Sequence, residues 1–502
     1  MDPRISEICH LLPGSRYANC LLSGFSDSRV IRAFREKVQH LQCGGISPST
    51  WSRNTFDLIF FQPSIPCEPS VAPGVYAALR DGGTAVVLVP TGYVGPLCQK
   101  IMESQKPFLK HDSMLISGIY GLTPSLEEIR LAVPLENKAC ASAALALYQP
   151  SLFNASCRKQ LAYLLGRMGL ARLWAPYAVV LVQKGQKWTW SGLPWIIRKT
   201  MKDNVLLALF TGTPGYLRKS TVQIMDDGGS ILGYCKTGDT PQTKSVLQNE
   251  AVSLQYISSL ALGNALTPTL LHAEESDNGT YHLVQSSRKK PLSSAPLVPD
   301  DRHQDFLTRI MEQTKIPGIF RESACHREVA KRLDDVGGTT ASEYLPCLRE
   351  AFSWSSEVLH KSNVILHLAH RDFTPWNTFI TNGRLYVFDW EFARTGWTPL
   401  TDAFHFILQK GILVDRRTPE ELWCRLTSEK TREGQFIHQC TSHVKASKET
   451  FLALLAFYLC DIMTMYIDYY EREGSITRDG KRLLTAWEQL LKMILDLKGP
   501  RH

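Results

Sequence analysis

The succession of apolar runs changes character near residue 190, and this change constrains the fold more than any other feature of the sequence. Before it, short apolar runs at residues 19–25, 56–61 and 84–90 alternate with helical stretches. Alternation of this kind predicts a parallel sheet with helices on its faces. After it, three strand-like runs are followed by many helical stretches, which predicts an α+β region.

The elements of the first region can be predicted one by one. Asp27 is expected to cap a helix over residues 27–41, because apolar residues recur on one face of that stretch. They are Val30, Ile31, Phe34, Val38 and Leu41. The helical stretch before residue 84 is expected to end in a turn at "RDGG". Residues 113–135 predict an antiparallel hairpin at the sheet edge, and residues 175–185 predict a final strand.

This order of elements, including the late antiparallel pair, resembles the Rossmann-like fold of the S-adenosylmethionine-dependent methyltransferases over about the first 185 residues. Such an enzyme needs a glycine-rich turn after its first strand. Here that turn reads "SGFSDS", with Gly24 as its one glycine, and "FFQPS" at residues 60–64 only faintly matches the Asn-Pro-Pro motif of some methyltransferases. We therefore expect a degenerate domain that serves packing or protein contacts, with live methyl transfer as the alternative.

The chain as a whole suits a folded protein of several domains. Its 502 residues exceed what one hydrophobic core accommodates, and 44% hydrophobic and 21% charged residues are ordinary globular values. The first twenty residues hold no apolar run of signal-peptide length, so we expect a cytoplasmic protein without a membrane span. Thirteen cysteines form no CxxC pair, and the net charge of +8 is spread thinly, which argues against zinc and nucleic-acid binding.

The second region begins with three strands, at residues 205–213 and within residues 220–236, where "DDGGS" marks a tight hairpin. The loop between the first two carries Gly212, Thr213 and Gly215, and its backbone is expected to approach a phosphate.

A helix over residues 245–260 then places Glu250 on its apolar face, with Val246, Leu247, Leu254 and Ile257. A carboxylate there needs a cation, and Lys236 is the expected partner in a pair that positions nucleotide phosphates. The alternative is a solvated Glu250 at the edge of the apolar arc.

The stretch "HRDFTPWNTFI" from His370, followed by "LYVFDWE", brings three oxygen-bearing side chains together. Phosphoryl transfer needs a group that orients or deprotonates the acceptor hydroxyl, and oxygen ligands that hold Mg²⁺ on the phosphates. We expect Asp372 to face the hydroxyl. Asn377, five residues later, and Asp389, on the following hairpin, are the expected metal ligands.

These motifs closely resemble the aminoglycoside phosphotransferase and choline kinase family, relatives of the protein kinases, from about residue 204 to near residue 502 and most strongly over residues 370–406. Arg371 departs from the small residue or asparagine usual in that family. The resemblance implies roles for several residues. By this resemblance Lys236 would contact the phosphates, Glu250 would orient Lys236, and backbone near Gln285 would bind adenine. Asp372 would be the catalytic base, and Asn377 and Asp389 would bind magnesium. His370 and Asp402 would brace the catalytic loop.

The sequence thus predicts an α/β Rossmann-like domain over residues 1–190, a kinase-like N-lobe over 191–290 and a helical C-lobe over 291–502. The expected activity is ATP- and Mg²⁺-dependent phosphoryl transfer to a hydroxyl of a small molecule, a sugar or sugar-containing metabolite. The alternatives are an inactive nucleotide-binding scaffold and a bifunctional methyltransferase and kinase. A protein partner or second copy is expected to bind the N-terminal domain.

The acceptor itself is the least constrained part of this prediction. Asp461 and Asp468 share a helix face and would suit a cationic acceptor, or they are ordinary helix-contact carboxylates. Trp376, Trp390 and Trp397 are expected to pack rather than to bind sugar.

Overall fold

The computed structural model describes residues 3–12, 17–45, 51–63, 71–104, 114–147, 153–185, 192–201, 204–293, 295–336 and 341–498. The chain divides into two compact units. The first comprises Met1–Thr213, Arg218–Leu247 and Leu270–Leu292, and the second comprises Pro214–Leu217, Gln248–Thr269 and Ser293–His502. The expected division at residues 190 and 290 stays a prediction.

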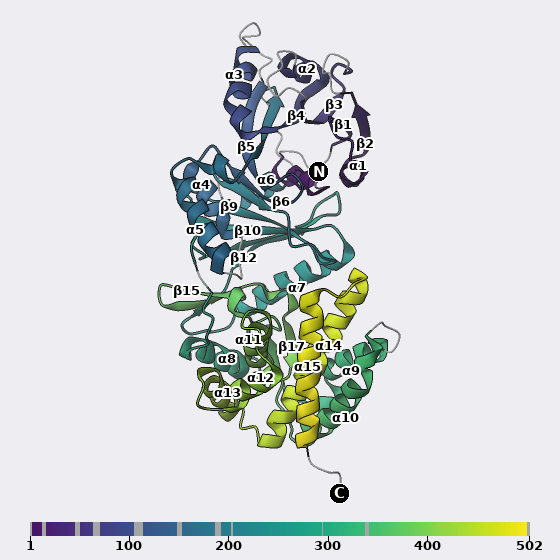
Figure 1. Ribbon diagram of the computed structural model, residues 1–502, viewed down its shortest axis with the longest axis vertical. Coiled ribbons are helices and arrows are strands. Elements are labelled where there is room, and N and C mark those ends of the chain that lie inside the picture. The colour runs from purple at the N-terminus through teal and green to yellow at the C-terminus, as the bar shows by residue number, and fades with distance from the viewer. Residues whose placement is uncertain are drawn as a thin grey trace. The chain divides into compact units, whose positions relative to one another are not determined.

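Within the described residues, a mixed sheet of twelve strands forms the centre of the first unit (Figure 1). Its strands are β1 (Asn19–Ser23), β2 (His40–Gly44), β3 (Phe56–Phe61), β4 (Leu79–Pro90), β5 (Met114–Pro124), β6 (Ile129–Pro134), β7 (Tyr177–Lys184), β8 (Leu206–Phe210), β9 (Ser220–Met225), β10 (Ile231–Gly238), β12 (Leu270–Glu275) and β13 (Tyr281–Ser286). Across the sheet their order is β12-β13-β10-β9-β8-β6-β5-β7-β4-β3-β1-β2.

Strand direction changes along this sheet. β2, β1, β3 and β4 are parallel, as the alternation of strands and helices predicted, and β7 and β5 follow in antiparallel pairs. The predicted hairpin is present as β5 and β6. Its predicted place at the sheet edge is wrong, because β6 pairs with β8 and both strands lie inside the sheet. Five of the six β6 residues are buried, which suits a strand covered on both faces.

Two further local predictions are corrected by strand pairing. Asp27 does cap helix α1 (Ser28–Arg35), where its side chain accepts from the Arg29 amide, but the helix ends at Arg35. Leu41 lies on β2 opposite Cys20 of β1, so the sheet ladder takes up the backbone groups that a longer helix would have used. The "RDGG" segment belongs to β4 rather than to a turn, and α2 (Val71–Ala78) ends just before it.

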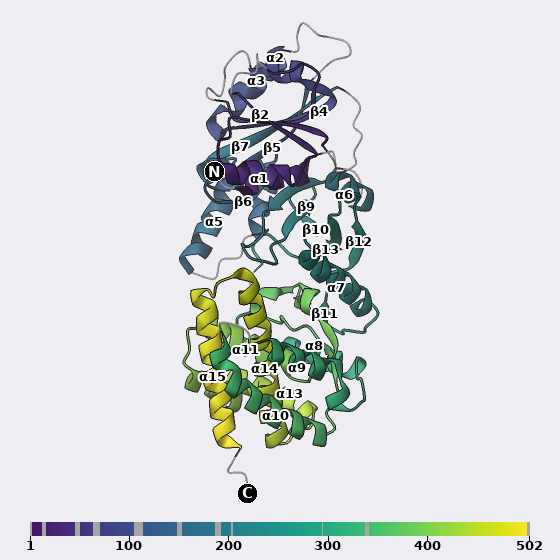
Figure 2. The ribbon, with the colours of Figure 1, turned by 90° about the vertical axis from the view of Figure 1, so that its right-hand side faces the viewer.

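One hydrophobic core runs along a face of the sheet from Cys20 of β1 to Val284 of β13. Three helices cover this face, namely η1 (Pro3–Leu11), α1 and α6 (Leu193–Met201), and they can be followed in Figure 2. Helices α2 and α3 (Val94–Ser104) pack on the other face. The strands before and after residue 190 therefore share one core, and burial of this apolar surface holds both parts together.

Glu7 on η1 is a buried carboxylate that joins several elements of the first unit. Its oxygens accept from Ser220 Oγ at 2.7 Å, from His10 Nε2 at 3.0 Å and from Arg218 at 3.2 Å, and Lys37 Nζ lies 3.5 Å away. Burial alone would raise the pKa of Glu7, but the charge of Lys37, the hydrogen bond with His10 and the charge of Arg218 together hold that pKa well below its ordinary value. Glu7 thus ties the N-terminal segment to the loop before β9.

We expect Glu7→Gln to lower the free energy of unfolding at pH 7 by about 2 kcal/mol, because the charged partners lose their carboxylate. The folded pKa of Glu7 lies below its ordinary value of 4.5, so the stabilisation is complete above that value and is lost as pH falls through the folded pKa. Urea unfolding of the full chain between pH 7 and pH 3 measures both effects. The exposed Glu36→Gln is the control, and an equal loss in the two variants would contradict the assignment.

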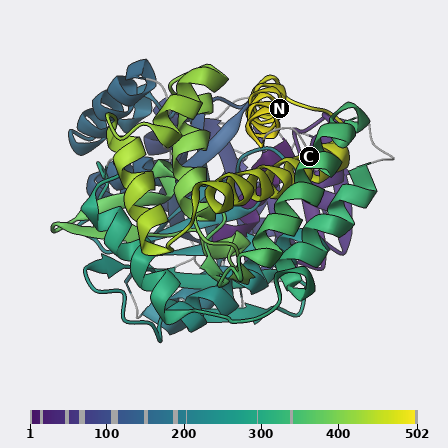
Figure 3. The ribbon, with the colours of Figure 1, turned by 90° about the horizontal axis from the view of Figure 1, so that it is seen from below.

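The second unit is mainly helical, and Figure 3 shows its green and yellow helices from below. Its helices are α8 (Asp301–Gln313), α9 (Ala324–Val336), α10 (Leu345–Lys361), α11 (Thr401–Leu413), α12 (Pro419–Thr427), α13 (Arg432–His443), α14 (Lys448–Glu473) and α15 (Arg478–Leu497). Its short strands are β11 (Ala265–Leu266), β14 (His367–Ala369), β15 (Thr378–Thr381), β16 (Arg384–Val387) and β17 (Arg394–Trp397). Helix α7 (Pro241–Ile257) has its first seven residues in the first unit and the rest in the second.

Helix α14 forms the centre of this unit and contacts α9, α10, α11 and α15. Among the described residues it is the one helix long and apolar enough to cross a membrane, and 83% of its most apolar stretch is buried inside the protein. A core helix packed on several sides needs the same apolar composition.

Candidate active site

The loop after β14 is held by the first turn of α11. Asp402 accepts from the backbone amides of His370 and Arg371, each at 2.8 Å, and His370 Nε2 lies 3.0 Å from the carbonyl oxygen of Phe388. Arg371 adopts φ +65°, a left-handed conformation that costs free energy for a side chain of this size. The Asp402 carboxylate thus fixes a strained loop. Because Asp372 directly follows Arg371, the fixed loop also sets the position of Asp372.

Both oxygens of the Asp372 side chain are engaged. Asn377 Nδ2 donates to Oδ2 at 2.7 Å and to the Asp372 carbonyl at 2.9 Å, and His405 Nε2 lies 3.2 Å from Oδ1. The carboxylate accepts, so His405 Nε2–H donates, and in the neutral ring Nδ1 accepts from Tyr458 Oη at 3.1 Å. The predicted pair Asp372 and Asn377 is therefore brought together, with the carboxylate held from two sides.

His405 was not predicted from the sequence. It lies three residues after Asp402 on α11, so both side chains lie on one face of the helix and reach the same loop. That spacing, once Asp402 is placed on the loop, is the signal that could have found it.

We expect His405→Leu to lower kcat by about tenfold with little change in the KM for ATP, because Asp372 loses one hydrogen-bond donor. His405→Gln retains a donor and should restore part of the rate. Steady-state kinetics of both variants, with the exposed His438→Gln as control, measures the effect. A full rate in His405→Leu, or no difference between the two His405 variants, would remove His405 from this role.

Asp389 follows the β15–β16 hairpin and adopts φ +71° and ψ +58°, a left-handed conformation that Asp tolerates better than most residues. The Phe388 amide donates to the Asn377 carbonyl at 3.1 Å, which brings the two predicted metal ligands onto neighbouring chain segments.

Asp389 belongs to a group of three carboxylates with Glu250 and Glu391, in which one oxygen of each lies within 4.8 Å of the others. Asn249 Nδ2 donates to the carbonyls of Glu391 and Ala393 at 2.8 and 3.1 Å, and so fastens α7 to this turn. Three close carboxylates repel one another unless a cation or proton is present, and their oxygens are the ligands that Mg²⁺ prefers. Glu391 was not predicted, although its place two residues after Asp389 in "DWE" was a signal.

Glu250 is 0% exposed, so the alternative of a solvated carboxylate is wrong. Lys236 lies half-buried on β10 of the first unit, whereas Glu250 belongs to the second. The pairing of the two residues spans the units and stays a prediction.

The other predicted nucleotide contacts lie on the loop after β8 and on β13. Thr213 is the last residue of this stretch of the first unit, and Gly215 lies in the second, where a Cβ atom would stand 2.4 Å from the Tyr469 hydroxyl. Gln285 is buried on β13 opposite Tyr234. The nucleotide roles of Thr213, Gly215 and Gln285 stay predictions.

Of the two alternatives for Asp461, contact with a cationic acceptor is wrong. It is buried, forms ion pairs with Arg332 and with Arg371 at 2.8 Å, and accepts from Trp397 Nε1 at 2.9 Å. The Arg371 guanidinium also stacks 4.0 Å over the Trp397 ring. Asp461 is therefore a helix-contact carboxylate, as the other alternative had it, and it neutralises the charge of Arg371.

Asp468 is exposed and pairs with Arg472 of the same helix at 2.9 Å. Trp390 and Trp397 are buried, as the packing prediction required.

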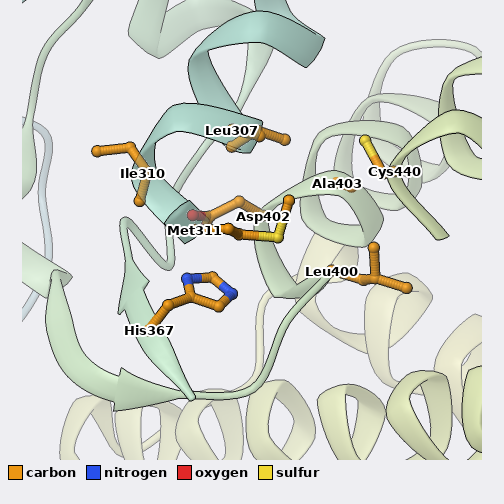
Figure 4. A pocket seen from close by; sticks show the side chains of 8 residues that line it. All are labelled: Leu307, Ile310, Met311, His367, Leu400, Asp402, Ala403 and Cys440. Atoms are coloured by element: carbon orange, nitrogen blue, oxygen red, sulfur yellow. The ribbon is translucent and has the colours of Figure 1, made fainter. Parts of the chain in front are cut away.

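An apolar pocket lies beside Asp402, between α8, α11 and α13 (Figure 4). It is lined by Leu307, Ile310, Met311, His367, Leu400, Asp402, Ala403 and Cys440. Burial lowers the pKa of His367, so its ring is neutral near pH 7. The Asp402 carboxylate in its lining already accepts the two backbone amides of the loop, so this pocket is separate from the Asp372 carboxylate held by Asn377 and His405.

Comparison with known proteins points to the same segment. Residues 300–436 match a family model described as "Phosphotransferase enzyme family". A search of curated proteins gave no match.

Several solved structures are similar. A thermostable mutant of aminoglycoside phosphotransferase APH(4)-Ia, in complex with ADP and hygromycin B, is 12% identical with a TM-score of 0.41, over 60% of this chain and 97% of that one. ADP-bound aminoglycoside phosphotransferase APH(2'')-Ib is 14% identical with a TM-score of 0.36, over 59% and 98%. Choline kinase LicA from Streptococcus pneumoniae is 14% identical with a TM-score of 0.38, over 60% and 100%. The part of the chain that carries Asp372, Asn377 and Asp389 is thus the part that matches the phosphotransferase enzyme family.

Proposed function

We propose that this protein is an ATP-dependent phosphotransferase that moves the γ-phosphoryl group to a hydroxyl of a small molecule, a sugar or sugar-containing metabolite. The observation that carries the proposal is the Asp372 carboxylate, held by Asn377 and His405 next to a turn that bears Asp389 and Glu391. The family match of residues 300–436 supports the same reaction class.

Asp372 acts on the acceptor hydroxyl in this proposal. Its carboxylate orients the hydroxyl and takes its proton as the oxygen attacks the phosphorus. The hydrogen bonds from Asn377 and His405 fix the carboxylate before substrate arrives, so little reorganisation is needed during transfer.

Asn377 donates through Nδ2 to Asp372, which leaves its amide oxygen as the atom for a metal ion. With Asp389 and Glu391 it gives an all-oxygen donor set that fits Mg²⁺. Bound Mg²⁺ would neutralise charge on the β- and γ-phosphates. Lys236 is proposed to contact the phosphates from β10, and backbone near Gln285 to bind adenine.

The test measures acceptor-dependent ADP formation from ATP and Mg²⁺ across sugars, nucleotide sugars and amino alcohols. Transfer to a sugar hydroxyl, lost in Asp372→Asn, supports the proposal. ATP binding without turnover on any acceptor would favour the inactive scaffold instead.

We further propose that residues 1–190 serve a structural role in a cytoplasmic enzyme and do not bind S-adenosylmethionine. Gly24 has φ +83°, and a Cβ atom there would lie 2.2 Å from the Gln62 carbonyl oxygen. The glycine thus accommodates the neighbouring chain segment, at the turn where a methyltransferase would bring bare backbone against its cofactor. Isothermal titration with S-adenosylmethionine tests this, and binding that a Gln62 variant weakens would instead indicate a bifunctional enzyme.

A further inference from the structure

The region around helix α5 (Phe153–Arg167) has an unusual charge balance. Between Asn137 and Lys202 the sequence holds ten Lys or Arg residues and no Asp or Glu. Arg158, Lys159 and Arg167 lie on α5 itself. Arg158 and Arg167 are exposed on α5, so this helix can attract an acidic partner.

An apolar stripe runs along the outward side of α5. Leu161 and Leu164 are each 58% exposed, Met168 is 70% exposed, and Cys157 is exposed. The Met168 amide donates to the Leu164 carbonyl at 3.1 Å, so the stripe continues through the last helical turn. We call these four residues the α5 seam.

The opposite side of α5 packs on α4 (Lys138–Ala143). Gly166 is buried there, and a Cβ atom at this position would lie 2.6 Å from Ser142 Oγ. Close packing on that side fixes the direction of the helix, so the α5 seam faces away from the core. Leucines on the outward face of a packed helix indicate an interaction surface.

The spacing of the α5 seam is that of a coiled-coil interface. Its members follow one another at intervals of four, three and four residues, which are the d, a, d and a positions of a heptad. At 3.6 residues per turn they occupy an arc of about 60°, narrower than the arc of a helix that lies on a membrane or a core. Arg158 then occupies an e position and Arg167 a g position, where charges select the partner helix.

We propose that the α5 seam binds an acidic amphipathic helix of a partner protein. Leucines of the partner helix would pack between Leu161 and Leu164, and carboxylates of the partner helix would pair with Arg158 and Arg167. A second copy of this chain fits poorly, because two α5 helices would bring arginines together with no carboxylate on either. The proposal is independent of the phosphotransferase reaction.

The experiment measures binding of the full chain to a labelled synthetic helix by fluorescence anisotropy. The probe has Leu at its a and d positions and Glu at its e and g positions, and a matched peptide has Lys in place of Glu. We expect the Glu peptide to bind at least about tenfold more tightly than the Lys peptide. Leu161→Gln with Leu164→Gln should weaken binding at least about tenfold, since Gln keeps the helix but removes the apolar contact. Leu497→Gln, an exposed leucine at the end of α15, is the matched control.

Charge reversal sharpens the test. Arg158→Glu with Arg167→Glu should transfer the preference from the Glu peptide to the Lys peptide. Circular dichroism and sedimentation velocity confirm that each variant is folded. Equal binding of both peptides to the wild type would overturn the proposal. So would a wild-type dimer that the two leucine substitutions dissociate, or seam-dependent binding to phosphatidylserine vesicles without binding of the Glu peptide.

Discussion

Asp372→Asn should lower turnover by about two or more orders of magnitude and leave the affinity for ATP nearly intact. The amide has almost the shape of the carboxylate but cannot accept the hydroxyl proton. Within the described residues, Asp372 is held by hydrogen bonds from Asn377 and His405, and an Asn side chain can keep part of this pattern, so the change should also leave the fold in place. Turnover is measured with the acceptor found in the panel, and ATP affinity by titration of the same preparation.

Asp468→Asn is the matched control for this prediction. Asp468 is an exposed aspartate on α14, paired with Arg472 of the same helix, and an exposed pair of this kind contributes little. Its substitution should leave turnover unchanged. Near wild-type turnover in Asp372→Asn would remove Asp372 from the mechanism, whereas an equal loss in both variants would point to a general effect of lost negative charge.

The sequence predicted those elements of the first unit that depend only on residues near one another in the chain. Phe56–Phe61 is a strand with the predicted bounds, and Asp27 caps the predicted helix. The position of the β5–β6 hairpin could not be predicted, because it depends on pairing with β8, about eighty residues further along the chain. Pairing over similar distances joins the strands before and after residue 190 in one sheet over a shared core, which the local pattern of apolar residues does not show.

In the site, too, residues close together in the sequence could be predicted, and residues brought together only by folding could not. Asp372, Asn377 and Asp389 were found because they lie within eighteen residues of one another on a loop and a hairpin. His405 and Glu391 could not be assigned to the site from spacing alone. Whether their side chains reach it depends on which way the helix face and the turn point in the folded chain. The sequence left open whether Asp461 contacts a substrate or another helix, because its partners Arg332 and Arg371 lie 129 and 90 residues away. A buried carboxylate and its distant cation can be matched only in the folded chain.

Asp389→Ala should weaken the binding of Mg·ATP by about a hundredfold or more, because it removes a charged oxygen ligand from the proposed magnesium site. Asp389 also has a left-handed backbone, which Ala adopts less readily than Asn. Asp389→Asn is therefore the matched variant, since it keeps the backbone and removes only the charge. Titration of ATP at several Mg²⁺ concentrations separates metal-dependent from metal-independent affinity. Both variants should lose the Mg²⁺-dependent part and keep the rest. Loss in Asp389→Ala alone would assign the effect to the backbone, and Mg·ATP affinity equal to that of the parent in both would exclude Asp389 as a metal ligand.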